Sequence, residues 1–446
     1  MTDSAGIPGG TEAAGGTPKP PNGRRRRLLR WAGIGTSLFV LAGVAGGWWV
    51  YSKLDGNITE DTSAAAELRR YDRERPVHLA GGAQNILLIG SDSRSGEGNS
   101  RYGQDEGTQR SDTTILLHLP ADRKSMTAVS IPRDLMAEIP ACLKPDGSRT
   151  TEQFAQFNGA FEWGGAACTI RTVEALTGIR VDHHMVVDFS GFKKMVDAVG
   201  GVEVCLKRPV DDPEAQLKLP AGRQTLQGEQ SLGFVRARYS LGNGSDTERM
   251  ERQQLFLGSL VKKVQSSGVL LNPAKLYPLL DAATSSVTTD PGLASLRGLY
   301  ELVRGMRDIP TDQIKFLTVP RRPYAADANR DELREPDASQ LFKRLRADEP
   351  LSIAPPEPTP RPADPSGPAS ASASTSAAAS APASAPVSTP RSTPRSTPQS
   401  DRAAESGADG KATAKAPGKA DGDGSADAPT PVPTFTGTTA GVADCR

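Results

Sequence analysis

The sequence predicts an α/β protein: a three-layer α/β/α sandwich with a mixed central sheet, preceded by one transmembrane helix and followed by a disordered tail. Between residues 84 and 350, short apolar runs typical of buried strands alternate with segments in which apolar residues recur at helical spacing. An uncharged apolar stretch near the N-terminus has the length of a membrane span. Residues 351–446 are rich in Ala, Ser, Pro and Thr and hold too few apolar residues for a packed core.

The transmembrane helix is predicted over residues 31–52. An arginine cluster that ends at Arg30 comes directly before the apolar run from Trp31 to Tyr51, and about 20 such residues span a bilayer as a helix. The positive-inside rule keeps residues 1–30, a disordered basic segment, in the cytoplasm. A cleaved signal peptide and a twin-arginine export signal are the alternatives, and the tryptophans that follow the small-residue run favour an uncleaved anchor. We therefore expect a single-pass protein of the cell membrane with its folded region outside the cytoplasm.

An extracytoplasmic connector, residues 53–83, precedes the folded domain at residues 84–350. Period-two and continuous apolar runs predict strands at 85–90, 113–119, 126–131, 181–188, 202–206 and 315–319. Helical spacing and capping residues predict helices near 63–70, 169–176, 190–200, 246–267, 273–280 and 293–306. A turn-rich connection joins the second and third strands as a hairpin.

Charged motifs lie where the first three strands end or begin. Asp92 follows the first strand, Arg110 and Asp112 precede the second, and Arg133 follows the third. The two hairpin strands share a rim, and antiparallel pairing of the first strand with the second would bring Asp92 to the same place. Two carboxylates and several arginines suit a magnesium ion and a pyrophosphate. The alternative is a set of solvated caps and surface ion pairs.

A second cationic group comes later in the chain. Arg236 and Arg238 alternate on a segment that we expect to be extended, so both should point to one side of it. Arg249 and Gln253 lie four apart on a predicted helix and share a face. This clustering favours an anion site, although acidic residues on the same helix leave a surface salt-bridge network open.

Other functions are not indicated. The sequence holds no Gly-x-Ser-x-Gly elbow, phosphate-binding loop or His-Glu-x-x-His zinc motif. His183 and His184 are neighbours on a predicted strand and face opposite ways, which favours packing over a metal pair. The same applies to His118 in an apolar strand. A formal net charge of +1 gives no overall attraction to nucleic acid, so no nucleic-acid partner is expected.

Four cysteines lie in the predicted extracytoplasmic part, where disulfides form. They are Cys142, Cys168, Cys205 and Cys445. Three pairings are possible if all are bonded, and the sequence alone does not choose among them. We prefer Cys142 with Cys168, because they flank one loop; the alternative is that some are buried thiols.

The motifs, taken together, resemble the LytR-CpsA-Psr family. They occur in unbroken order over residues 84–265 as NILLIGSDSR, RSDTT, SIPRD, FNGAFEWGG, VDFSGFKKMVDAVGGVEV, LQGEQSLGFVRARYS and DTERMERQQ. The cysteines inside the domain resemble those of actinobacterial members. The resemblance implies an α/β/α fold with an apolar groove for a polyprenyl chain. It also implies transfer of a wall glycopolymer from a polyprenyl-pyrophosphate carrier onto peptidoglycan. Membrane lipid is a further expected partner.

Site residues follow from this resemblance position by position. Asp92 and Asp112 resemble the carboxylates that hold magnesium, with manganese as a substitute. The pyrophosphate-binding set would be Arg110, Arg133, Arg236, Arg238, Arg249 and Gln253. Gln156 stands where many members carry Lys, which puts a cationic contact at that point in doubt.

The expected function is that of a magnesium-dependent phosphotransferase in cell wall assembly. The residues expected to act in catalysis are Asp92, Asp112, Arg133, Arg236 and Arg238. Two other functions use the same residues: an extracytoplasmic regulator that binds polyprenyl phosphate, and a pyrophosphatase without a glycan acceptor.

Overall fold

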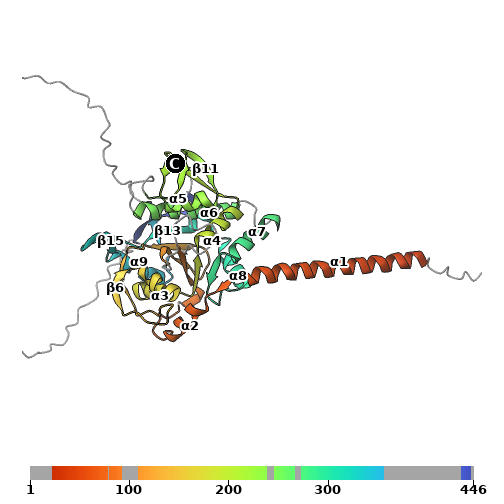
Figure 1. The fold of residues 1–446 in the computed structure, drawn as a ribbon, viewed down its shortest axis with the longest axis horizontal. Helices are drawn as coiled ribbons and strands as arrows, with labels where there is room; N and C mark the ends of the chain where they lie inside the picture. The colour runs from red at the N-terminus through yellow and green to blue at the C-terminus, as the bar shows by residue number, and fades with distance from the viewer. Residues whose placement is uncertain are drawn as a thin grey trace, which may run out of the picture. The chain divides into compact units, whose positions relative to one another are not determined.

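A computed structural model describes residues 23–78, 80–92, 109–238, 246–266, 273–355 and 433–442. Within them the central feature is a mixed nine-stranded sheet with the strand order β1-β12-β7-β2-β3-β4-β13-β17-β16 (Figure 1). Its strands are β1 (Thr59–Glu60), β2 (Gln84–Ser91), β3 (Ser111–Leu119), β4 (Met126–Ile131), β7 (His183–Val187), β12 (Val287–Thr289), β13 (Ile314–Thr318), β16 (Ser352–Ala354) and β17 (Thr434–Thr439).

Nine α-helices and four short strand pairs surround this sheet in the described part of the chain. The helices are α1 (Gly23–Gly56), α2 (Thr62–Arg70), α3 (Gly159–Thr177), α4 (Phe189–Ala198), α5 (Gly228–Arg236), α6 (Asp246–Ser266), α7 (Pro273–Thr284), α8 (Leu296–Met306) and α9 (Asp337–Arg346). The strand pairs are β5 (Met136–Ile139) with β6 (Gln153–Gln156), β8 (Val202–Leu206) with β11 (Gly222–Leu226), β9 (Val210–Asp212) with β10 (Leu217–Leu219), and β14 (Arg321–Tyr324) with β15 (Asp327–Leu333).

The middle of the sheet determines which strand ends meet. β3 pairs antiparallel with β2 and with β4, whereas β7 runs parallel to β2 and β13 runs parallel to β4. The C-terminal ends of β2, β4, β7 and β13 therefore share one edge of the sheet with the start of β3. We call this edge the rim.

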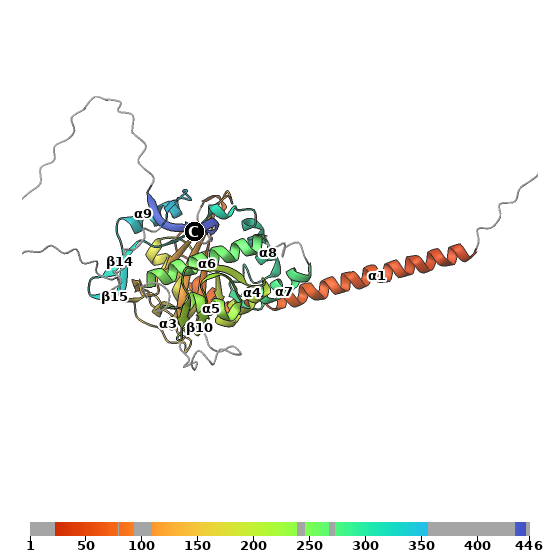
Figure 2. The same cartoon turned by 90° about the horizontal axis from the view of Figure 1, so that it is seen from above.

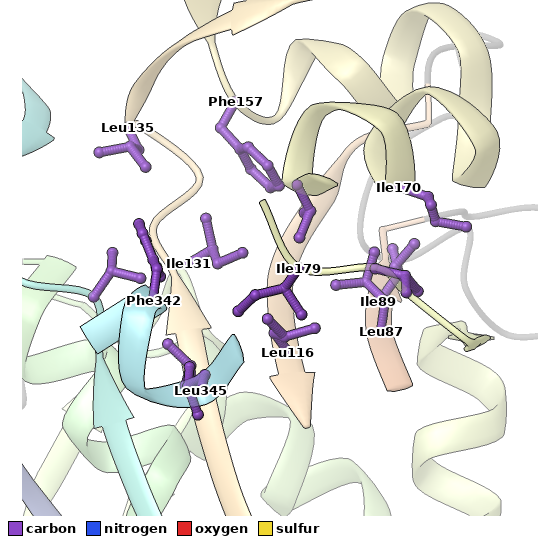
Figure 3. Packing of buried hydrophobic residues seen from close by; sticks show 14 of the residues in the cluster. Leu87, Ile89, Leu116, Ile131, Leu135, Phe157, Ile170, Ile179, Phe342 and Leu345 are labelled. Atoms are coloured by element: carbon purple, nitrogen blue, oxygen red, sulfur yellow. The ribbon is translucent and has the colours of Figure 1, made fainter. Parts of the chain in front are cut away.

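Alternation along the strands distributes apolar side chains to both faces of the sheet. Leu87 and Ile89 of β2 belong to a core shared with α2, α3 and α9, which Figure 3 shows at close range. Ile86, from the same strand, belongs to a core shared with α6 and α8. Figure 1 shows α5 and α6 on one side of the sheet and α3 and α9 on the other, and Figure 2 looks onto α6 from above. The predicted α/β/α sandwich with a mixed sheet is confirmed.

A third core lies beyond the sheet on the side of α6. Val196 of α4, Phe234 of α5 and Phe256 of α6 pack there with the apolar residues of β8–β11. The rings of Phe234 and Phe256 lie 6.2 Å apart between centroids. This cluster attaches α5 to α6, and both helices carry residues of the predicted anion site.

The predicted strands and helices of the domain are present, with shifted ends. The largest shift is in α3, which the spacing predicts for residues 169–176 and which begins at Gly159. A bend at Gly164 and Gly165 interrupts its helical geometry and hides its first turns from a periodicity argument. Gly164 is required there, because a Cβ at this position would lie 2.8 Å from the Cβ of Cys168 and 2.9 Å from that of Cys142.

These two cysteines form the disulfide that the sequence favours, with Cα atoms 5.5 Å apart. It closes a loop of 26 residues and joins α3 to the segment after β5. Cys205 is also disulfide-bonded. Cys445, the fourth cysteine that the sequence predicts could form a disulfide, lies outside the described residues.

The N-terminal helix α1 contains a stretch, Arg27–Gly56, that is long and apolar enough to cross a membrane. The predicted span at residues 31–52 lies inside it. Its C-terminal end is joined to the domain: Lys53 Nζ donates to the Tyr277 hydroxyl over 3.0 Å, and the Leu296 amide donates to Asp55 Oδ1 over 2.8 Å. Residues 1–22 of the predicted basic segment lie outside the described residues.

The end of the chain departs from the predicted tail at residues 351–446. β16 and β17 are part of the main sheet: β17 pairs antiparallel with β13 and parallel with β16. Phe435 of β17 is buried in the core that includes α3 and α9. A disordered tail is therefore wrong for residues 352–354 and 434–439, where backbone pairing and apolar burial stabilise the chain. Residues 356–432 lie outside the described residues.

The connector is attached to the domain through Asp61, the N-cap of α2. The Asp61 amide donates to the Thr289 carbonyl over 2.8 Å. Its carboxylate accepts from the Ala64 amide over 2.9 Å and from the Ser63 hydroxyl over 2.7 Å. Buried His184 lies 3.4 Å away across an ion-pair contact. Burial alone would raise the pKa of Asp61, but His184 and the two donors lower it from the ordinary 3.8 to about 2.

We predict that Asp61→Asn lowers the melting temperature near neutral pH. Because the carboxyl pKa is depressed in the fold, the stability that it contributes is present above pH 4 and is lost as the pH falls towards about 2. The melting temperatures of variant and wild type should therefore converge over that interval. Asp308→Asn, which removes an exposed carboxylate paired with Arg307, is the control. A difference in melting temperature between variant and wild type that stays constant from pH 7 to pH 2 would contradict this account.

Candidate functional site

The predicted charged residues meet at the rim because β2, β3 and β4 are antiparallel neighbours. The Asp92 amide donates to the Arg110 carbonyl over 3.0 Å, and the Arg110 amide donates to Asp92 Oδ1 over 2.6 Å. These bonds extend the β2–β3 pairing by one step. The Arg110 guanidinium turns to α3, where Nε donates to Glu162 Oε2 over 2.9 Å. Ser93 and Arg94 of the first motif lie outside the described residues.

Asp112 occupies a β-bulge at the start of β3. Gly90 pairs with Thr113 and Ser91 with Ser111, so Asp112 has no residue opposite it on β2. Such a bulge redirects a side chain and is frequent beside functional sites. Asp112 is directed to β4, and its Oδ1 accepts from an Arg133 guanidinium nitrogen over 2.8 Å.

Arg133 lies between several carboxylates at the end of β4. Its Nε also donates to Asp134 Oδ2 over 3.2 Å. Burial lowers the pKa of Arg133, but the negative charges of Asp112, Asp134 and Asp246 outweigh it and raise the pKa above its usual value. Asp246 belongs to α6, so this guanidinium connects the sheet rim to that helix electrostatically.

Asp246 at the start of α6 holds the second cationic group. Its Oδ1 lies 2.7 Å from a terminal nitrogen of Arg249, whose side chain is only 5% exposed, and 3.5 Å from a terminal nitrogen of Arg238. Its other oxygen, Oδ2, is buried and has no hydrogen-bond partner among the residues that the structure describes. Arg238, Arg249 and Arg133 thus lie around one carboxylate. A doubly charged anion would find donors in place here.

Arg236 does not lie on an extended segment, as the sequence suggests; it is the last residue of α5. Its guanidinium lies 4.9 Å from the centre of the Phe189 ring. Beyond it the backbone leaves the helix at Ala237, and the Arg238 amide donates to Asp212 Oδ2 over 3.2 Å. The two arginines therefore come from a helix end and the loop after it.

Side chains of α6 satisfy the last carbonyl groups of α5, which a helix end leaves without partners. Arg252 Nε donates to the Phe234 carbonyl over 3.2 Å, and another of its nitrogens donates to that of Ala237. Gln253 Nε2 donates to the Val235 carbonyl over 3.1 Å. Burial first, then the charge of Arg249, lowers the pKa of Arg252 to about 10. Gln253 therefore positions the α5 end; a contact to pyrophosphate stays a prediction.

The sequence argument missed several residues of this site. Asp246 is only the first residue of a predicted helix in the sequence, and its role as counter-ion depends on distant arginines. Asp134 forms ion pairs with Arg133 and with Arg330, whose guanidinium nitrogen lies 3.5 Å from Asp134 Oδ1. The same oxygen accepts from Gln156 Nε2 over 2.9 Å. Gln156, the position at which the sequence puts a cationic contact in doubt, therefore donates to a carboxylate. The Arg-Asp dipeptide of the third motif is the signal that could have indicated Asp134.

The rim offers carboxylate oxygens as possible metal ligands. Among the described residues, no group of three or more His, Cys, Asp or Glu side chains gathers as a metal site. Magnesium needs only one or two carboxylates, because water and substrate phosphates complete its shell. Asp92 and Asp112, on neighbouring strands at one rim, fit that requirement in donor type and number.

His183 and His118 are hydrogen-bonded within the fold, as the sequence favours, and the buried His184 ring lies 3.4 Å from Asp61 Oδ2. His183 Nδ1 lies 3.0 Å from Asp290 Oδ1. His118 lies between Asn85 Oδ1 at 2.8 Å and Asp348 Oδ1 at 3.0 Å, and its burial lowers the pKa of the ring. Neither contributes to the rim.

We predict that Asp246→Asn destabilises the domain and that inorganic pyrophosphate partly restores its stability. Losing one partner of a buried ion pair costs roughly 3 kcal/mol, because the cations stay buried, and an added anion can replace the lost charge. Urea unfolding of the full chain in detergent, with and without pyrophosphate, measures both effects. Asp211→Asn, which breaks an exposed pair with Lys218, should change neither. Equal stability of Asp246→Asn and wild type would contradict the assignment.

The chain is similar in sequence to known proteins of cell wall biosynthesis. The family model described as the LytR_cpsA_psr family matches residues 54–347. The cell wall biosynthesis protein LcpA of Corynebacterium glutamicum is 39% identical over 269 residues, 54% of this chain. The chain spans about half the length of that relative, 51%.

Two further relatives cover more of the chain. Polyisoprenyl-teichoic acid–peptidoglycan teichoic acid transferase TagV of Bacillus subtilis is 26% identical over 312 residues, 69% of this chain and 74% of that protein. The solved structure of a LytR-Csp2A-Psr enzyme from Actinomyces oris has 20% identity and a TM-score of 0.48, and covers 61% of this chain and 93% of that one.

Proposed function

The chain belongs to the LytR_cpsA_psr family, and on this premise we propose that it is a phosphotransferase of cell wall assembly. It moves a glycopolymer from a polyprenyl-pyrophosphate carrier onto peptidoglycan. The names of its relatives, a cell wall biosynthesis protein and a teichoic acid transferase that acts on peptidoglycan, support the class of reaction.

One observation carries the proposal: arginines from three separate segments converge on Asp246 beside a rim that holds two aspartates. Arg133 comes from the end of β4, Arg238 from the loop after α5, and Arg249 from α6. Their charges are held in position before any ligand binds. Preorganised donors of this kind stabilise charge that develops on phosphoryl oxygens.

The reaction is a displacement at phosphorus. A hydroxyl oxygen of the acceptor glycan forms a bond to the sugar-linked phosphorus of the donor. The bond from that phosphorus to the bridging oxygen breaks, and polyprenyl monophosphate leaves with the electron pair. Arg133, Arg236 and Arg238 neutralise charge on the phosphoryl oxygens. The hydroxyl proton passes to a rim carboxylate.

The proposed cofactor is magnesium, or manganese in its place, held by Asp92 and Asp112. When bound, it supplies positive charge to the phosphate oxygens. Asp112 is directed to the rim by its bulge and by the bond from Arg133. Asp92 is held in place by the bonds between its own groups and the Arg110 backbone.

The proposed location is the outer face of the cell membrane, with the N-terminus in the cytoplasm. α1 supplies a helix of sufficient length and apolar character, and the arginines in its first turns favour this orientation. The end of α1 contacts α7 and α8 through Lys53 and Asp55. The anchor keeps the site beside the membrane where a polyprenyl carrier resides.

We predict that Asp92→Ala or Asp112→Ala abolishes magnesium-dependent transfer from a lipid-linked donor to peptidoglycan oligomers, with melting temperatures near wild type. Arg236→Ala or Arg238→Ala should lose more than about 10²-fold in transfer rate, since a preorganised charge contact is removed. Lysine at these positions should rescue only part of the loss, because an ammonium cannot bind phosphate bidentately.

The control is Arg297→Ala, which removes an exposed arginine of α8 that pairs with Glu301; its transfer rate should match wild type. Assaying transfer beside phosphate release separates the proposal from the alternatives. Release of polyprenyl phosphate without transfer would indicate a pyrophosphatase, and binding without turnover would indicate a regulator. If Asp92→Ala transfers at the wild-type rate while magnesium is chelated, the mechanism is discarded.

A further inference from the structure

A groove of about 600 Å³ lies at the rim, one strand away from the arginine cluster. The start of α6, the end of β13, the strand β17 and the start of α9 form its walls. This volume lies within the roughly 300–1,000 Å³ typical of small-ligand sites. The residues of the proposed phosphotransferase site do not line it, so the groove is a separate feature.

Its near end is joined to the charged site by contacts of Arg321, which lines the groove. One guanidinium nitrogen of Arg321 donates to the Thr247 hydroxyl, and another donates to Asp331 Oδ1. Thr247 directly follows Asp246. The Asp331 amide donates to the Asp134 carbonyl over 3.1 Å. The groove and the arginine site are therefore joined by direct contacts through Arg321 and Asp331.

The lining combines apolar surface with dispersed polar groups. Leu255 is 41% exposed on α6, and Val319 and Phe435 lie at the sheet. Glu251 of α6 and Gln340 of α9 bring a carboxylate and an amide. A pyranose ring has apolar C–H faces and hydroxyl groups at its edges. The apolar residues of the lining can pack on the faces, and the carboxylate and the amide can hydrogen-bond to the hydroxyl groups. An isoprenoid chain would leave these polar groups desolvated, which is costly.

Much of the groove comes from the end of the chain. Ile353, Pro355 and the residues of β17 line it, and all lie beyond the family match at residues 54–347. Thr434 and Thr436 alternate on β17, and both are exposed. The strand that the sequence places in a disordered tail thus completes one wall and adds hydroxyl groups to it.

We propose that this groove binds the acceptor, a glycan strand of peptidoglycan, and presents its hydroxyl to the arginine rim. This inference rests on the proposed function and names the site that selects its acceptor. β17 then acts as a specificity element of this chain, because it contributes lining that lies outside the matched family region.

The test blocks the groove by Gln340→Trp and, separately, by Thr436→Trp in the full chain in detergent. Both positions are exposed, so the indole should enter the groove without entering the core. With uncrosslinked peptidoglycan oligomers as acceptor, KM for the acceptor should rise about tenfold or more. KM for the lipid-linked donor and the acceptor-free release of polyprenyl phosphate should change by less than about twofold. Melting temperatures verify folding.

Ser339→Trp is the matched control, because Ser339 precedes Gln340 on α9, is exposed and does not line the groove. It should leave both KM values unchanged. If both groove variants transfer at the wild-type rate with an unchanged KM for the acceptor, the groove does not bind the acceptor, and the proposed function still stands. A raised donor KM with an unchanged acceptor KM would assign the groove to the lipid and overturn the proposal. If the wild type transfers nothing to peptidoglycan, the proposed function itself fails.

Discussion

Antiparallel pairing of β3 with both β2 and β4 is the constraint on which the site depends. It brings the end of β2, the start of β3 and the end of β4 to one rim. Residues separated by tens of positions, Asp92, Asp112 and Arg133, become neighbours for this reason alone. Helices packed on both faces bury these strands, so the rim is held rigidly. The bulge at Asp112 then sets the direction of one carboxylate against Arg133.

Charge at this rim is balanced by a small number of shared carboxylates. Asp246 forms ion pairs with Arg249 and Arg238, and its charge also stabilises protonated Arg133. Asp134 forms ion pairs with Arg133 and Arg330. Holding buried cations in this way costs desolvation free energy that simple packing would avoid. This cost is explained if the cations bind a doubly charged ligand. The same α6 that carries Asp246 holds the end of α5 and lines the neighbouring groove.

The central strands and the hairpin that forms the rim could be predicted from the sequence, because they follow from local patterns. The Cys142–Cys168 disulfide was the preferred one of several pairings that the sequence left open. Continuous apolar runs identify β2 and β4, and hairpin pairing follows from a short turn. Arg236 could not be placed correctly, because its segment ends a short helix whose carbonyl groups are bonded by Arg252 and Gln253 from another helix. β17 was missed because its pairing partner, β13, lies more than a hundred residues earlier. Composition around it indicates disorder, whereas burial of Phe435 and backbone pairing decide otherwise.

The chemical identity of the product tests the central claim most directly. Wild-type full chain would be incubated with a lipid-linked glycopolymer and peptidoglycan oligomers, and the products analysed by mass spectrometry and phosphorus NMR. We predict a phosphodiester between the polymer and a glycan hydroxyl of peptidoglycan, with one polyprenyl monophosphate released for each linkage. Polyprenyl monophosphate accompanied only by free phosphorylated polymer would contradict the account, since water would then be the acceptor.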